Sequence, residues 1–259
     1  MNYWQLPRIR TGSIAIWHRN VLVWKRLLGP AMVFNFGEPT LYLLGLGFGL
    51  GMFIGEMGNM PYIHFLASGI VASSAMTTAS FEGMYSVYTR MVPQRTYEAI
   101  MTTPLDIDDI LAGEMLWCAS KAVISAAAIL IVALFLGVVH DWMAILVLPV
   151  VFLVGLCFAA PAIFVSSLAT NYDFFNYYQI LFVTPMFIIC DVFYPIETLP
   201  AIMQSIVQFL PLTHAVALTR PLITGAPLTQ PLLHIGVLLL YTIISYYLAV
   251  VMVRRKLLV

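Results

Sequence analysis

Residues 143–168 have the sequence MAILVLPVVFLVGLCFAAPAIFVSSL and contain no charged side chain. The hydrocarbon core of a bilayer is about 30 Å thick, and an α-helix needs roughly 20 predominantly apolar residues to cross it. The run is long enough to do so. It also lacks the alternation with period two that marks the strands of a membrane barrel. The stretch therefore predicts a membrane-spanning α-helix.

The composition extends this prediction to the whole chain. Of the 259 residues, 61% are hydrophobic and only 9% are charged, whereas about 25% of the residues of a typical soluble domain are charged. We predict an all-α integral membrane protein with six transmembrane helices. These helices cover residues 31–54, 63–85, 110–137, 143–168, 175–193 and 232–253.

The positive charges predict the orientation, because membrane proteins keep loops rich in Lys and Arg on the cytoplasmic side. Most of them lie before the first span, between the second and third, or after the last: Arg8, Arg10, Arg19, Lys25, Arg26, Arg90, Arg95, Arg254, Arg255 and Lys256. Only Lys121 and Arg220 fall elsewhere. We therefore expect both termini and the loop 86–109 in the cytoplasm, and the segment 194–231 outside.

The first 30 residues form a unit that precedes the six-helix domain 31–259. Residues 13–28 place apolar side chains and two tryptophans among four basic groups, a pattern typical of a helix lying in the membrane interface. An ordinary cytoplasmic extension of the first span is the alternative. Because the apolar run begins only after Pro30, we expect no cleaved signal peptide.

The loop between the second and third spans has a helical pattern of its own. Residues 88–100, YTRMVPQRTYEAI, include Arg90, Gln94, Arg95 and Glu98. Loops between neighbouring helices can be far shorter, so this length suggests a docking surface for a cytoplasmic partner. On charge alone, a solvated loop explains the segment equally well.

Four short strings are spread over nearly the whole chain. They are RTYEAIMTTPL at 95–105 with its continuation DIxxGExxWxxxKA from Asp109, EPxxYLxGLGxGLG at 38–51, FYPIExLP at 193–200 and PLTHAVxLxR at 211–220. Taken together and in order, they resemble type 2 ABC exporter permeases, and among them the nodulation protein J subfamily. The resemblance implies a bacterial inner-membrane protein that forms a homodimer and binds two copies of a separate ABC ATPase.

The resemblance also implies roles for two segments. Residues 88–100 would be the coupling helix that receives motion from the ATPase, with Arg90, Gln94, Arg95, Tyr97 and Glu98 as coupling residues. The proline-rich segment 194–231 would form re-entrant helices at the outer end, although a surface loop without a gating role is the alternative. The outer gate would include Asp191, Phe193, Tyr194 and Pro195. Asp191 departs from the small residue expected before the FYP motif.

The chain is not expected to hydrolyse ATP itself. A phosphate-binding loop requires G-x-x-x-x-G-K-[ST], yet Lys25, Lys121 and Lys256 are the only lysines and none follows a glycine. We expect no catalytic residue, metal or cofactor in this chain. ATP and magnesium would bind the partner ATPase.

Candidate substrate-path residues are acidic or aromatic and fall within or beside the spans: Glu38, Tyr42, Glu82, Tyr85, Tyr172 and Tyr178. A carboxylate at the bilayer centre costs about 2.5–3.5 kcal/mol on insertion scales, so the glutamates either pair within the protein or contact substrate. Aromatic rings can stack on sugars, and they also form interfacial belts in any membrane protein. The resemblance implies a lipid-linked oligosaccharide or similar amphiphile as cargo.

Rival classes of function remain open. An ABC exporter of drugs, antibiotics or polysaccharide fits the same features, and an ion-coupled secondary transporter is an alternative of another class. The five histidines are scattered without a metal-ligand spacing, which argues against an intramembrane enzyme. The formal net charge is zero, so nucleic acid is not an expected partner.

Overall fold

The computed structural model of the protein describes residues 3–8, 10–26, 28–139 and 142–258, with some side chains of the second helix left undescribed. Helices make up nearly all of the described elements, joined by one short hairpin. In chain order the elements are α1 (Gly12–Lys25), α2 (Leu28–Gly49), α3 (Gly51–Ile54), β1 (Glu56–Met57), β2 (Met60–Pro61), α4 (Tyr62–Phe81), the π-helical turn η1 (Glu82–Ser86), α5 (Val87–Met91), α6 (Thr96–Ile100), α7 (Ile107–Phe135), the 3₁₀ turn η2 (Trp142–Leu146), α8 (Val147–Leu168), α9 (Phe174–Tyr178), the π-helical turn η3 (Gln179–Val183), α10 (Thr184–Ile189), the 3₁₀ turn η4 (Ile196–Thr198), α11 (Ala201–Val207), α12 (Pro211–Thr224) and α13 (Pro231–Leu257).

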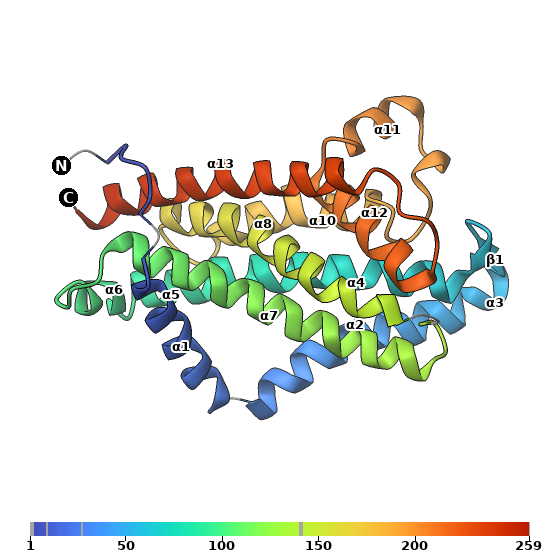
Figure 1. Ribbon diagram of the computed structural model, residues 1–259, viewed down its shortest axis with the longest axis horizontal. Helices are drawn as coiled ribbons and strands as arrows, with labels where there is room; N and C mark the ends of the chain where they lie inside the picture. The colour runs from blue at the N-terminus through green and yellow to red at the C-terminus, as the bar shows by residue number, and fades with distance from the viewer. Residues whose placement is uncertain (1–2, 9, 27, 140–141, 259) are drawn as a thin grey trace.

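Helix α8 is the centre of the bundle and packs against α4, α7 and α13, which run alongside it (Figure 1). Small residues allow this close approach. A Cβ atom added at Gly155 of α8 would lie 2.7 Å from the Cα of Ala119 on α7, closer than two such atoms can come. Small residues are common where membrane helices meet. In lipid there is no hydrophobic driving force between helices, so their association depends on close van der Waals packing, which small residues allow.

In the part of the chain that the structure describes, three helices are long and apolar enough to cross a membrane: Ile107–Phe135, Trp142–Leu168 and Pro231–Leu257. A fourth candidate is the pair Ala201–Val207 and Pro211–Thr224, which is bent by 84° and is either a broken span or a re-entrant loop. The all-α membrane fold is therefore confirmed. Helices also cover the other three predicted spans, but as shorter, more polar or interrupted segments. The count of six spans stays a prediction.

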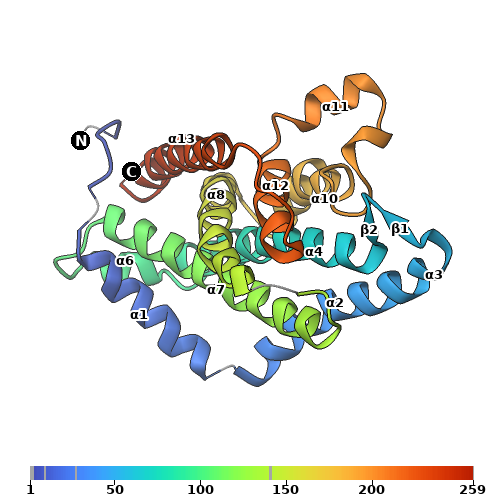
Figure 2. The ribbon, with the colours of Figure 1, turned by 45° about the vertical axis from the view of Figure 1, so that its right-hand side comes forward.

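The N-terminal helix α1 lies across α7 rather than apart from the bundle, and it diverges from α2 at a sharp angle (Figures 1 and 2). Its contact with α7 is close, since a Cβ added at Gly113 would be 2.5 Å from the Cβ of Ile16. The indole of Trp17 donates a hydrogen bond of 3.0 Å to the Ser120 hydroxyl. Its placement in the membrane interface stays a prediction, but α1 is joined to α7 by specific contacts.

The two ends of the bundle differ in what they carry. One end holds the described N-terminal residues, α6 and the C-terminal end of α13, while the hairpin, α3 and α11 lie at the other (Figure 1). At the first end, α7 begins with a capping box. The Asp106 side chain accepts a hydrogen bond from the backbone N–H of Asp109, and the Asp109 side chain accepts one from the backbone N–H of Asp106. Such reciprocal capping satisfies backbone N–H groups that a helix start would leave unpaired.

Candidate functional site

The predicted coupling segment consists of two short helices, α5 and α6, rather than one continuous helix. The turn between them includes Arg95, whose φ of 48° places it in the left-handed region. Gln94, Arg95 and Glu98 are exposed at the end of the bundle. Arg90 and Tyr97 point inward instead, and Tyr97 is completely buried. The five predicted coupling residues therefore divide into an exposed set and a buried set.

Arg90 belongs to a charged cluster, by which we mean Glu82, Arg90, Glu114 and Lys121. Its Nη2 atom donates to Oε2 of Glu114 at 2.7 Å and lies 3.4 Å from Oε1 of Glu82. The side chain of Glu114 is 0% exposed and that of Arg90 is 13% exposed. A buried carboxylate of this kind is tolerable only with a nearby cation and further hydrogen bonds.

Glu82 forms the other half of the charged cluster. Its carboxylate accepts a bond of 2.8 Å from Nζ of Lys121 and one of 2.9 Å from the Trp117 indole. Glu82 also begins the π-helical turn η1. Turns of this type interrupt α-helices and are frequent at functional sites. Of the two explanations for Glu82, pairing within the protein is the one its contacts support.

The charged cluster ties α1 and the coupling segment to α7. Asn20 on α1 donates a bond of 3.0 Å from Nδ2 to the same oxygen of Glu114 that binds Arg90. Burial, and the Glu114 carboxylate beside it, raise the pKa of the Tyr97 phenol on α6. Glu114 is therefore the point at which side chains from α1, α5 and α6 meet.

Sequence reasoning did not select Asn20, Glu114, Trp117 or Lys121 as site residues. The last three were visible in the motif that carried the resemblance, where they follow one another at spacings of three and four. Residues three and four apart share one face of a helix. That spacing was the available signal, but the partners Glu82, Arg90 and Asn20 lie on other helices.

An aromatic group lies where α4 and η1 approach α9. The ring of Tyr85 stacks on Phe81 with centroids 4.3 Å apart, and it is nearly parallel to Tyr172 at 6.2 Å. The Tyr172 hydroxyl hydrogen-bonds Thr89 Oγ1 at 2.9 Å. Phe81 and Tyr172 are 59% and 43% exposed, respectively. These rings present an aromatic face on the surface of the single chain.

The six predicted substrate-path residues are not all brought together. Tyr178 packs beside the aromatic group and stacks on Phe182 at 5.6 Å. Tyr42 contacts Phe187 of α10 instead, at 6.1 Å between ring centroids. Glu38 lies on α2, but its side chain is outside the part of the chain that the structure describes. Of the predicted substrate-path residues whose side chains the structure describes, Tyr85, Tyr172 and Tyr178 gather in one place.

Asp191 is held by Arg220, and we call their contacts the arginine clamp. Two guanidinium nitrogens of Arg220 bond to the side chain and the carbonyl of Asp191. Its Nε atom donates to Ser68 Oγ at 3.0 Å, and the guanidinium lies 3.8 Å from the centroid of the Phe65 ring. The unexpected acid at 191 thus has a dedicated partner on α12.

The remaining predicted gate residues lie in the same loop, against α4 and α10. A Cβ added at Gly69 of α4 would come within 2.7 Å of the Val192 carbonyl oxygen, and Phe193 packs edge-on to Phe187 at 4.9 Å. Tyr194 and Pro195 are half-buried. Further along, His214 and His234 join α12 to α13 through their Nδ1 atoms at 2.7 Å. The loop and the bent pair α11–α12 therefore form one corner of the molecule. We call it the outer corner, after the prediction that the segment 194–231 lies outside.

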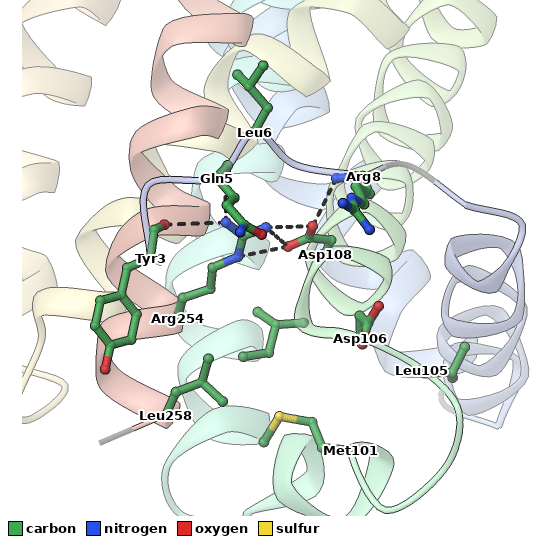
Figure 3. Close-up of a pocket in the computed structure, with 11 residues that line it drawn as sticks. Tyr3, Gln5, Leu6, Arg8, Met101, Leu105, Asp106, Asp108, Arg254 and Leu258 are labelled. Carbon is green, nitrogen blue, oxygen red and sulfur yellow. Dashed lines mark hydrogen bonds and ion pairs between the residues drawn. The ribbon is translucent and has the colours of Figure 1, made fainter. Parts of the chain in front are cut away.

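A pocket of about 520 Å³ lies at the end of the bundle that carries α6, which we call the coupling end. It is found between the N-terminal residues 3–8 and the loop that follows α6 (Figure 3). Its inner wall is the ion pair of Arg254 with Asp108, at 2.6 Å. Arg254 also donates to the Gln5 carbonyl at 2.6 Å, and the Arg8 backbone N–H donates to Asp108 at 2.8 Å. These bonds hold residues 3–8, which we call the N-terminal strap, across the start of α7 and the C-terminal end of α13.

The helical architecture and the two packed ends define a multi-pass membrane protein, and the sequence profile of the ABC-2 type transporter family matches residues 12–224. The chain belongs to this family. It is 42% identical over 254 residues to nodulation protein J of Rhizobium leguminosarum bv. trifolii, covering 98% of this chain and 97% of that protein. It is 42% identical over 253 residues to nodulation protein J of Rhizobium meliloti (strain 1021), covering 97% and 96%.

More distant similarity extends to a transport permease of another bacterium. The chain is 22% identical over 240 residues to the inner membrane transport permease YadH of Escherichia coli (strain K12), covering 92% and 91%. The family and these relatives make the chain the membrane subunit of an ABC transporter. They confirm the resemblance that its short motifs indicated.

Proposed function

We propose that the chain is the membrane subunit of an ATP-driven exporter, acting as a homodimer with two copies of a separate ATPase. The observation that carries this proposal is the division of the coupling segment. Gln94, Arg95 and Glu98 are exposed where a partner can bind, whereas Arg90 and Tyr97 of the same segment enter the bundle. A partner that bound the exposed set would act on α7 through the buried set.

The energy source is ATP held by the partner together with magnesium. The chain has three lysines, and none stands in a phosphate-binding loop of the G-x-x-x-x-G-K-[ST] type. The membrane subunit then contributes docking, gating and the cargo path. Its ATPase must be another polypeptide.

In this proposal the coupling end lies in the cytoplasm of a bacterium, and the outer corner lies on the opposite side of the inner membrane. The structure supplies support for this orientation, because it accounts for the two exceptions to the positive-charge bias. Lys121 is paired with Glu82, and Arg220 is paired with Asp191. A cation paired in this way carries little weight for orientation, since its charge is balanced locally.

The cargo we propose is a lipid-linked oligosaccharide or similar amphiphile. The exposed rings of Phe81 and Tyr172, with Tyr85 between them, offer flat faces and hydroxyl groups at the surface of the chain. Such faces bind the apolar side of a sugar ring, and neighbouring hydroxyls bind its edge. The similarity to nodulation protein J supports the same class of cargo only by analogy, because one fold serves many cargoes.

Capture of the partner tests the exporter proposal. The tagged full chain, purified in mild detergent, should retain an ATPase that hydrolyses ATP, and Arg95→Ala or Glu98→Ala should reduce that retention on the order of tenfold. Glu197→Ala is the matched control, since Glu197 is an exposed acid at the opposite end. If both variants retained the ATPase and transported like wild type, the docking role of this segment would be wrong.

Transport and cargo require separate measurements. In vesicles, the reconstituted complex should move cargo only with ATP, whereas transport driven by an ion gradient without the ATPase would identify a secondary transporter. Lipid and glycan analysis of a deletion strain should show an amphiphilic glycolipid retained in the cells. Retention of a drug or of a lipid-free polysaccharide instead would assign the chain to an exporter of another cargo.

A further inference from the structure

We propose that His214 and His234 form a proton-sensitive bridge, which joins α12 to α13 near neutral pH and opens when both rings become charged. The inference goes beyond the proposed function and does not depend on it. The observation behind it is a contact between two imidazole rings on separate helices, with their Nδ1 atoms 2.7 Å apart.

The two histidines occupy equivalent positions in their helices. Helix α12 begins with PLTH at 211–214, and α13 begins with PLLH at 231–234. Proline is favoured at the first helical position, because its fixed φ suits the helix and its missing N–H would have been unpaired there. In both helices the histidine is the fourth residue. The repeated P-L-x-H start therefore brings one imidazole to the first turn of each helix, where the two rings meet.

The second ring nitrogen of His214 decides which ring donates. Its Nε2 atom lies 2.9 Å from the Gln208 carbonyl oxygen, and a carbonyl can only accept, so this nitrogen carries a proton. A neutral imidazole has one N–H donor and one acceptor nitrogen. Nδ1 of a neutral His214 is therefore the acceptor, and Nδ1 of His234 donates to it.

The bridge can hold one additional proton but not two. The first can enter at His234, whose ring has the Thr229 carbonyl as a neighbouring acceptor, and one hydrogen still lies between the two Nδ1 atoms. The second must enter at Nδ1 of His214. Both Nδ1 atoms then carry a hydrogen, and no lone pair is left between them. Because two positive charges also face each other, the bridge breaks.

The surroundings of the rings do not offset a second positive charge. The described groups that act on the rings are the rings themselves and the Gln208 and Thr229 carbonyls, with no carboxylate among them. His214 is 7% exposed, and burial without an opposite charge penalises a charged ring. Both rings also lie in a first helical turn, where the positive end of the helix dipole repels a cation.

The other ionisable groups of the surrounding elements are not partners of the bridge. Among the described residues they are Tyr62, His64, Cys157, Cys190, Asp191, Tyr194, Glu197, Arg220 and Tyr241, and none of them acts on either ring. Asp191 and Arg220 are paired in the arginine clamp. The Tyr241 hydroxyl donates to the Phe209 carbonyl at 2.7 Å. The charge of the bridge is therefore set by its own two rings.

Opening of the bridge affects one side of the outer corner. It releases the start of α13 from α12, while the arginine clamp still joins α12 to Asp191. The clamp does not open with the bridge, because a guanidinium stays charged at every pH at which the protein is folded. In the orientation that we propose for the chain, acid outside the cell is the signal that opens the bridge.

A structural link without any response to protons is the competing explanation. It predicts the same contact between the rings near neutral pH. The two explanations differ on acidification, where a structural link persists and a proton-sensitive bridge is lost. Histidine ordinarily changes charge between about pH 5 and 8, so this is the range to measure.

The first experiment observes the contact between the rings directly. The full chain, labelled with nitrogen-15 in histidine and held in lipid vesicles, should show a solid-state NMR correlation between two Nδ1 nuclei at about pH 7.5 and lose it at about pH 5. His214→Asn identifies the signal by removing it. His18→Gln is the control, since His18 is exposed on α1, and it should leave the correlation unchanged.

The second experiment measures stability against pH. In the unfolded chain both rings take up protons freely, whereas the bridge admits one, so its stabilisation is present near neutral pH and lost as the pH falls. In His234→Asn the amide can donate to His214 or accept from it without being protonated. The fall in thermal midpoint between about pH 8 and about pH 5 should therefore be roughly half that of wild type. His18→Gln should follow the wild type.

Three results would overturn the bridge. Absence of the nitrogen correlation near neutral pH would show that the rings are not bonded, and its persistence in acid would show that the contact is insensitive to protons. A fall in thermal midpoint as large in His234→Asn as in wild type would assign the acid sensitivity to other groups. Failure of the proposed function would change none of these measurements, because they use neither the ATPase nor the cargo.

Discussion

The two ends of the bundle both bury charged groups, but they satisfy them differently. In the arginine clamp, every guanidinium nitrogen of Arg220 has a partner among Asp191, Ser68 and Phe65. In the charged cluster, Nε of Arg90 is buried without one among the described residues. The clamp is a closed set of bonds, whereas the charged cluster has bonds left to make.

The difference indicates how each end can behave. A fully bonded clamp resists displacement, because any movement leaves a buried charge unpaired. A cluster with a free donor can exchange one arrangement for another at lower cost, which is what a transmitting element requires. We therefore expect the clamp to hold the outer corner together and the charged cluster to respond to the coupling segment.

The largest difference between the two ends is expected in their labelling from the two sides of the membrane. A cysteine introduced at position 95 should react with an impermeant maleimide only in inverted vesicles, and one at 205 should react in intact cells. The three native cysteines are buried, so background labelling is expected to be low. Labelling of position 95 in intact cells would reverse the orientation.

Removal of Arg220 is expected to have the largest effect on stability. Arg220→Met leaves Asp191 without its cation, and breaking a buried pair costs about 3–5 kcal/mol. The measurement is the temperature at which the purified protein loses its monodisperse peak on size exclusion. Restoration by the paired change Asp191→Asn would confirm that the unpaired carboxylate, rather than the lost packing of Arg220, is responsible.

Removal of Lys121 should cost less than removal of Arg220. Lys121→Met takes one bond from Glu82, but Arg90 and the Trp117 indole remain beside that carboxylate. We expect a loss of about 1–3 kcal/mol, the range for a buried polar group that loses one partner. An effect equal to that of Arg220→Met in the same thermal assay would contradict the distinction between the two ends.

The smallest effect is expected at the surface of the coupling end. Arg10 and Asp106 form an ion pair at 2.8 Å, but both side chains are at least half exposed. Exposed pairs contribute about 0–1 kcal/mol and are screened by salt. Arg10→Ala should therefore leave the thermal midpoint within error of wild type. A large shift would mean that the pair orients the N-terminal strap.

Much of the fold could be predicted because lipid imposes a simple rule on sequence. The predicted spans 110–137, 143–168 and 232–253 match α7, η2–α8 and α13 to within a few residues. Apolar runs of membrane length can hardly fold otherwise. Prediction was weaker for 88–100, where the turn at Arg95 divides the expected helix, and for the spans that π-helical turns or glycines interrupt.

The sequence by itself determined the class of protein and the lengths of the main helices, since these follow from apolar runs and from local motifs. The tertiary structure alone decided the partners. Glu82 meets Lys121, Asp191 meets Arg220, and Asn20 meets Glu114 only because separate helices pack side by side. A one-dimensional pattern records which charges lie within the membrane domain, but the pairing of charges far apart in the chain depends on how the helices pack.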